Sequence, residues 1–152
     1  MKRNLKTMDP EELFPPLLAL LDDTPAVPLV ISGYSMTPFL LHGRDTVYFS
    51  KITQPPQRGD MVLYRRDNGS YVLHRVYEAG FTYTMVGDAQ TLLEQGIRPD
   101  QMLAQVSAVC RKGKKLQKGS FWWEFFEKVW IRNLSIRPTL ISVYCHMRKL
   151  FN

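Results

Sequence analysis

The sequence predicts a mostly β fold, a small antiparallel barrel or coiled sheet, with a short helix before it and two amphipathic helices after it. Between residues 27 and 111, short β-branched or aromatic runs alternate with segments rich in Gly, Pro, Asn and Asp. The 152 residues, 45% of them hydrophobic and 22% charged, suit a single globular domain with its own core. We therefore divide the chain into a helical segment at 1–26, a β core at 27–111 and a basic aromatic tail at 112–152.

The first element that we expect is a short helix over residues 9–22. Asp9 suits the N-cap, Pro10 suits the first helical position, and two glutamates fall in the first turn. The segment TPAVPL then ends the helix. The basic start MKRNLK is not followed by an apolar run, so we expect no signal peptide. The uncharged stretches of the chain fall far short of the roughly 20 apolar residues that span a bilayer, so we expect no membrane-spanning helix.

Six runs are expected to form the strands of the core: VPLVIS, DTVYFSK, DMVLYRR, SYVLHRVYE, FTYTMVG and MLAQVSAVCRK. The turn RRDNGSY gives the clearest hairpin signal, because Asn-Gly tolerates the positive φ angles of a tight turn. The longer segment DAQTLLEQGIRPD is expected to be a loop that leads into the last strand. Short strands at this spacing favour an antiparallel sheet.

The positive charge of the chain is concentrated in its tail. Residues 1–110 carry ten Lys or Arg and twelve Asp or Glu, whereas residues 111–152 carry ten and two. The segments SFWWEFFEKVWIRNL and PTLISVYCHMRKLF both have amphipathic helical spacing. Their aromatic and cationic composition is typical of helices that lie on an anionic membrane surface. A helical pair packed on the core, or a dimer interface, is the alternative.

The sequence contains no motif that is typical of a metal or cofactor site. There is no HExxH, no CxxC, no carboxylate-rich loop and no phosphate-binding glycine loop, and Cys110 and Cys145 stand far apart. The aromatic and basic residues of the tail do not alternate on an expected sheet as nucleic-acid platforms do. We expect no metal, no cofactor and no nucleic acid.

What remains is serines, histidines and aspartates, which are the ingredients of nucleophilic acyl transfer. His74 is expected on a strand face between Val72 and Val76, whereas His42 and His146 are expected at the surface. Judged by spacing alone, a histidine on an apolar strand face is more often structural than catalytic.

Four segments in order, SGYSMTPFLLHGRDTVYF, RGDMVLYR, YVLHRVY and VGDAQ, resemble the signal peptidase I family of membrane-associated serine proteases. The resemblance covers roughly residues 27–111. The bacterial branch of that family has lysine as general base, and its archaeal and endoplasmic-reticulum branch has histidine, so the His-Arg pair at 74–75 is similar to the second branch. The resemblance implies a serine endopeptidase that cleaves a leader or signal peptide after small residues.

Carried over by position, the resemblance makes Ser35 the nucleophile, His74 the general base and Asp88 the acid that orients His74. It assigns the oxyanion to the backbone amide of Ser35 and a second nearby donor. The residues expected at the oxyanion site and in the pocket are Ser32, Gly33, Met36 and Pro38. A neutral histidine on a rigid strand fits the role of base near neutral pH.

The chain departs from the family pattern in four places. Arg44 is inserted in the Gly-Asp turn that follows the serine box, and Gln90 stands where asparagine is expected. No second downstream aspartate is obvious, so Glu94 and Asp100 are alternatives to Asp88 as third catalytic member. Residues 1–26 are too short and too acidic for the usual membrane anchor.

Two other functions stay open at this point. One is a catalytically inactive protease-fold module that binds a membrane or a partner protein, and the other is a self-cleaving repressor-type peptidase, which uses a Ser-Lys dyad. For the peptidase we expect substrates with small residues before the cut and an anionic membrane surface that binds residues 112–152. This places the protein at a membrane periphery in a bacterial or archaeal-like cell, with the cytoplasm as the alternative.

Overall fold

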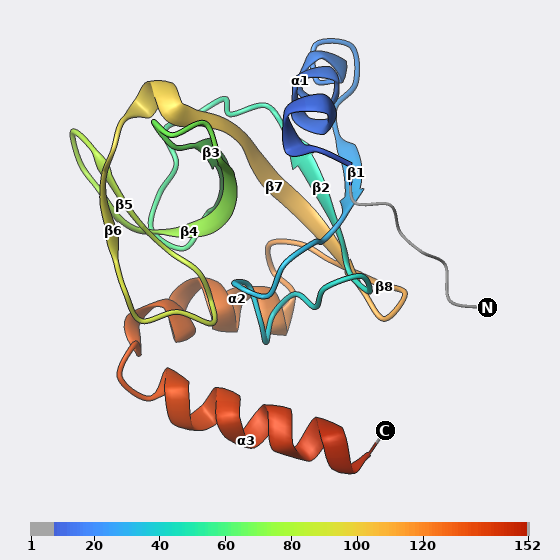
Figure 1. The fold of residues 1–152 in the computed structure, drawn as a ribbon, viewed down its shortest axis with the longest axis vertical. Helices are drawn as coiled ribbons and strands as arrows, with labels where there is room; N and C mark the ends of the chain where they lie inside the picture. Colours follow the sequence, from blue (N-terminus) through green and yellow to red (C-terminus); the bar gives the residue numbers. More distant parts are fainter. Residues whose placement is uncertain (1–7, 152) are drawn as a thin grey trace.

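The computed structural model describes residues 8–151. It contains an eight-stranded antiparallel sheet in the order β1-β2-β7-β3-β4-β5-β6, with β8 paired to β7 (Figure 1). The sheet coils strongly but does not close, since β1 and β6 lie at its two ends. The strands are β1 (Val27–Val30), β2 (Thr46–Ser50), β3 (Met61–Arg65), β4 (Tyr71–Ala79), β5 (Tyr83–Val86), β6 (Glu94–Ile97), β7 (Met102–Arg111) and β8 (Lys114–Leu116). The prediction of a mostly β fold flanked by helices is confirmed.

Helix α1 (Pro10–Leu20) begins as its sequence predicts. The Asp9 side chain accepts a hydrogen bond from the Glu11 N–H at 3.0 Å and so satisfies one of the free amides of the first turn. Leu17 and Leu21 are buried in the core, which fixes the helix against the end of the sheet that carries β1 and β2.

The β3–β4 hairpin forms at Asn-Gly and sets the register that the site depends on. Gly69 has φ +90°, and the Asn68 side chain accepts from the Ser70 N–H at 3.0 Å. The register pairs Val62 with His74 directly. Because side chains alternate with a period of two, Tyr64 lies on the same face as His74 and diagonally across from it.

Two strands were not expected from the sequence. β6 lies inside the segment expected to be a loop, and it pairs Glu94 with Met85 and Ile97 with Tyr83 of β5. The sequence EQGI has no alternation of apolar and polar residues, so its strand conformation comes from pairing with the free edge of β5. β8 is short and follows a tight turn at residues 112–113, both with positive φ.

The first part of the basic tail packs in the main core, and the last part lies outside it. Buried residues of helix α2 (Phe121–Lys128) and the 3-10 turn η2 (Trp130–Arg132) join the cluster that contains α1 and the loop after β1. Helix α3 (Arg137–Leu150) then runs along the outside of α2 (Figure 1). Within residues 8–151, no helix combines the length and apolar character needed to cross a membrane. The tail residues buried in this cluster are Trp123, Phe126 and Trp130.

Candidate active site

The loop over residues 31–45, between β1 and β2, carries the serine box and is closed at its base by main-chain hydrogen bonds. The Ile31 N–H donates to the Asp45 carbonyl and the Gly43 N–H donates to the Ile31 carbonyl, both at 2.8 Å. The Asp45 carboxylate is fully buried, accepts from the Leu41 N–H at 2.8 Å and pairs with Arg44. The inserted arginine therefore helps to close the loop.

Within this loop, apolar anchors hold Ser35 in place. Met36, Phe39 and Leu40 are buried in the core, while Ser35 itself is half-buried. Gly33 has φ +98°, a conformation that glycine adopts without strain, and its N–H donates to Nδ1 of the exposed His42 at 3.0 Å. His42 is thus at the surface as expected, and it is a partner of the loop that the sequence did not reveal.

Gly87, in the loop after β5, contacts both the loop that carries Ser35 and the side chain of His74 on β4. The Ala89 N–H donates to the Ser35 carbonyl at 2.8 Å. A Cβ atom at Gly87 would lie 2.6 Å from the Ser35 carbonyl oxygen and 3.1 Å from His74 Nε2. Only glycine fits between the Ser35 carbonyl and the His74 ring, so the packing of these two groups depends on Gly87.

Ser35 and His74 line one cavity of about 310 Å³. No hydrogen bond joins their side chains in the part of the chain that the structure describes. Three of the expected pocket residues, Ser32, Gly33 and Met36, also line the cavity, whereas Pro38 is not among its lining residues. A second cavity of about 510 Å³ shares Arg66 and Gln90 with the first.

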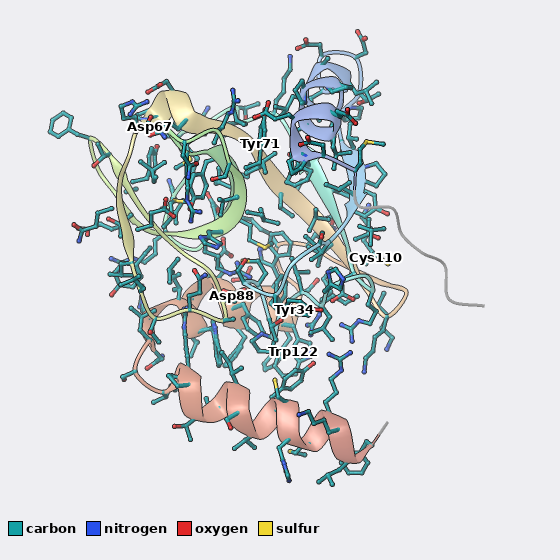
Figure 2. All side chains as sticks on the ribbon, in the orientation of Figure 1. Tyr34, Asp67, Tyr71, Asp88, Cys110 and Trp122 are labelled. Atoms are coloured by element: carbon teal, nitrogen blue, oxygen red, sulfur yellow. The ribbon has the colours of Figure 1, made fainter. Side chains whose placement is uncertain are left out.

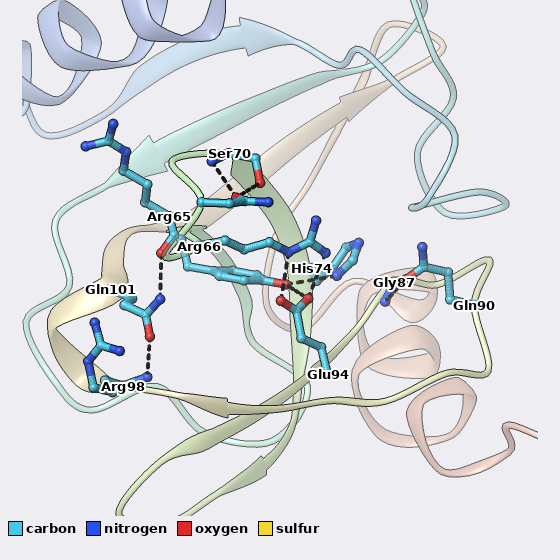
Figure 3. Close-up of polar contacts among 11 residues, drawn as sticks. Arg65, Arg66, Ser70, His74, Gly87, Gln90, Glu94, Arg98 and Gln101 are labelled. Carbon is cyan, nitrogen blue, oxygen red and sulfur yellow. Dashed lines mark hydrogen bonds and ion pairs between the residues drawn. The ribbon is translucent and has the colours of Figure 1, made fainter.

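His74 is buried, with 3% of its surface exposed, and its ring belongs to a polar chain (Figure 3). Nδ1 lies 3.2 Å from the Tyr64 hydroxyl, which in turn donates to the Glu94 carboxylate at 2.6 Å. Arg66 donates twice to the same carboxylate, at 2.7 and 2.8 Å. Of the acids expected behind His74, Glu94 is therefore connected to it, through a tyrosine that the sequence did not single out.

The environment keeps His74 neutral. Burial lowers the pKa of His74 to about 4; the charge of Glu94 opposes this shift and that of Arg66 adds to it. The hydrogen bond from Arg66 in turn lowers the pKa of Glu94, which stays ionised. At neutral pH the His74 ring is therefore uncharged.

Asp88 has a different partner from the one expected. It is fully buried, between the sheet and α2 (Figure 2), and Arg75 Nε donates to its two carboxylate oxygens at 2.9 and 3.1 Å. Burial raises the pKa of Asp88, and the charge of Arg75 acts against that shift. The structure thus pairs Asp88 with Arg75 rather than with His74. Asp100, the remaining alternative, pairs with Arg98 at the surface.

Side chains of the C-terminal segment bind the main chain of the loop at 87–90. Trp130 Nε1 donates to the Asp88 carbonyl at 2.9 Å, and the fully buried Arg137 donates to the carbonyls of Gly87 and Gln90 at 2.9 and 2.8 Å. Arg137 stands just before the segment expected to be the last helix, and nothing in the sequence pattern shows that its side chain points back into the protein.

The site combines two of the side chains that nucleophilic acyl transfer uses, a serine and a histidine. A serine and a neutral histidine share a cavity, and within residues 8–151 no group of three or more His, Cys, Asp and Glu side chains is placed to hold a metal ion. Comparisons of the chain with protein-family models, with curated proteins and with solved structures find no match.

Proposed function

We propose that this protein is a serine endopeptidase of the signal peptidase I type, with Ser35 as nucleophile and His74 as general base. The observation that carries the proposal is that both residues line one cavity and both approach Gly87, although they come from a loop and a strand far apart in the sequence. A serine hydroxyl needs a neighbouring base to attack a peptide bond, and His74, which is neutral, has an unprotonated ring nitrogen that can take this role.

In the proposed reaction, Ser35 Oγ attacks the scissile carbonyl while His74 Nε2 takes its proton. The imidazolium then gives that proton to the leaving amine, the C–N bond breaks, and an ester on Ser35 remains. Water, deprotonated by His74, hydrolyses the ester and restores the hydroxyl. The Ser35 N–H bonds no main-chain acceptor among the described residues and is available to the oxyanion.

The substrate class that we propose is an extended peptide with small residues before the cut. Residues 71–74 of β4 pair with β3 on one side, while the pairing of β4 with β5 begins only at Arg75. In the described part of the chain this leaves a short strand edge beside the cavity, where a peptide can add as a further strand. The cavity walls there are Ile31, Met36, Val72 and Leu73, which suit small apolar side chains.

A peptide panel tests the proposal. Purified protein is incubated in detergent with peptides that carry Ala-x-Ala, Gly-x-Ala or Leu-x-Phe before one bond, and products are identified by mass spectrometry. We expect cleavage after the small residues, loss of cleavage in Ser35→Ala, and wild-type rates in the control Ser107→Ala on the exposed side of β7. If wild type leaves every peptide intact, the peptidase proposal is abandoned in favour of an inactive protease-fold module.

We further propose that α3 binds the surface of an anionic membrane. Large apolar side chains on α3 and at its two ends are 45% to 82% exposed, and from residue 136 to residue 150 they repeat at intervals of four and three residues. Arg148 and Lys149 lie in the last turn of the helix. A second copy would bring two strongly basic tails together, which disfavours a dimer on this face and favours an anionic surface. The exposed residues are Ile136, Leu140, Val143, Met147, Leu150 and Phe151.

Vesicle flotation tests this second proposal. The full chain should float with vesicles that contain phosphatidylserine and not with pure phosphatidylcholine. The double variant Leu140→Ser with Met147→Ser should lose flotation, while Cys145→Ser, on the opposite side of the helix, should keep it. Equal flotation of both variants would contradict the proposed surface.

A further inference from the structure

We propose that Tyr64 is the positioning residue of the site: its hydroxyl accepts the Nδ1 proton of His74 and thereby keeps Nε2 unprotonated on the side of Gly87 and Ser35. The inference rests on the proposed function, in which His74 Nε2 acts as the base. It adds a member that neither the sequence pattern nor the Ser-His pair requires, and it places Tyr64 between the histidine and the acid.

The number of available protons decides the direction of each hydrogen bond. The Glu94 carboxylate accepts two bonds from Arg66 and one of 2.6 Å from Tyr64, and as an ionised acid it has no proton to give. Tyr64 has a single hydroxyl proton, and the short contact to Glu94 uses it. The 3.2 Å contact between the Tyr64 oxygen and His74 Nδ1 must therefore take its proton from Nδ1.

The surrounding charges keep each proton where this scheme needs it. Burial first, and then the hydrogen bond to Glu94, raise the pKa of Tyr64, so its hydroxyl stays protonated. The hydrogen bond from Arg66 lowers the pKa of Glu94, so that group stays ionised. Glu94 and Arg66 are also the charged groups that act on His74, and they do so with opposite sign.

A neutral imidazole with its proton on Nδ1 has its lone pair on Nε2. Nε2 is the ring atom that faces Gly87. It would lie 3.1 Å from a Cβ atom placed on that glycine. The fold secures this arrangement through the β3–β4 register, which sets Tyr64 and His74 on one face, and through β6, which brings Glu94 to the tyrosine. Tyr64 itself is fully buried and has no room to turn away.

The test is the tautomer of His74, read from long-range proton–nitrogen NMR spectra of ¹⁵N-histidine-labelled protein at pH 7. The chain has three histidines, and the His74→Gln variant identifies the signals of His74 by their loss. In wild type we expect a protonated Nδ1 and a free Nε2. In Tyr64→Phe we expect protonated Nε2 to appear, while Tyr83→Phe, another buried tyrosine of the same cluster, should match wild type.

Turnover gives a second readout on the same proteins. Tyr64→Phe should lower kcat by about tenfold, the equivalent of one ordinary hydrogen bond, with KM changed less than about twofold. A free Nδ1 and a protonated Nε2 in wild type would overturn the proposal without any variant. An unchanged tautomer together with unchanged kcat in folded Tyr64→Phe would also overturn it. If wild type cleaves no peptide, the proposed function fails, and the tautomer still decides the role of Tyr64.

Discussion

Replacing His74 by glutamine should remove a pH-dependent loss of stability. Burial lowers the pKa of His74 from 6.5 to about 4 in the folded protein, so below pH 6.5 the unfolded chain binds a proton that the folded protein does not. Stability from this group is complete above pH 6.5 and is lost as the pH falls towards 4. Linkage gives a loss of about 2 kcal/mol by pH 5 and about 3 kcal/mol by pH 4.

Urea unfolding at pH 7, 5 and 4 measures this effect, with the fluorescence of the buried Trp123 and Trp130 as the signal. The free energy of unfolding of wild type should fall more steeply than that of His74→Gln, by the amounts above. The control His146→Gln, on the exposed α3, should follow the wild-type curve. If wild type and His74→Gln change in parallel between pH 7 and 4, the argument that burial keeps His74 neutral is refuted.

Three further substitutions test how the site is built. Gly87→Ala places a Cβ 2.6 Å from the Ser35 carbonyl and should lower kcat by about 100-fold, while Gly80→Ala, whose nearest atom is 3.6 Å away, should leave kcat unchanged; equal rates would contradict the close approach. Asp88→Asn leaves the buried Arg75 without its counter-charge and should cost about 3 kcal/mol in urea unfolding, so wild-type stability would show that the pair is not structural. Arg137→Met removes the donors to the carbonyls of Gly87 and Gln90 and should lower kcat by about tenfold, with partial recovery in Arg137→Lys; full activity in Arg137→Met would show that α3 does not support the loop.

Local signals predict much of the fold. Asp9 and Pro10 place the start of α1, and the Asn-Gly pair places the β3–β4 turn, because each acts through hydrogen bonds or φ angles within a few residues. The sequence does not show β6, because its residues lack alternation and become a strand only by pairing with β5. Arg137 is likewise missed, since its partners at 87–90 lie about fifty residues earlier in the chain.

The same distinction applies to the site. The four sequence segments, through the resemblance, predict that Ser35 and His74 lie near each other, and both line one cavity. The sequence does not show which carboxylate is connected to His74, because that depends on two strand registers. The pairing of β3 with β4 places Tyr64, and the pairing of β5 with β6 places Glu94. Asp88 has the right motif, but its side chain is taken by Arg75, the neighbour of His74 on the opposite face of β4.

The central claim, that Ser35 attacks a peptide bond with His74 as its base, is tested most directly by single-turnover cleavage of one Ala-x-Ala peptide. The rates of wild type, Ser35→Ala and His74→Ala are compared at pH 7 with enzyme in excess and with folding checked by fluorescence. We expect cleavage by wild type and a loss of at least about 100-fold in each variant. Cleavage at the wild-type rate by folded Ser35→Ala would contradict the proposed role of Ser35.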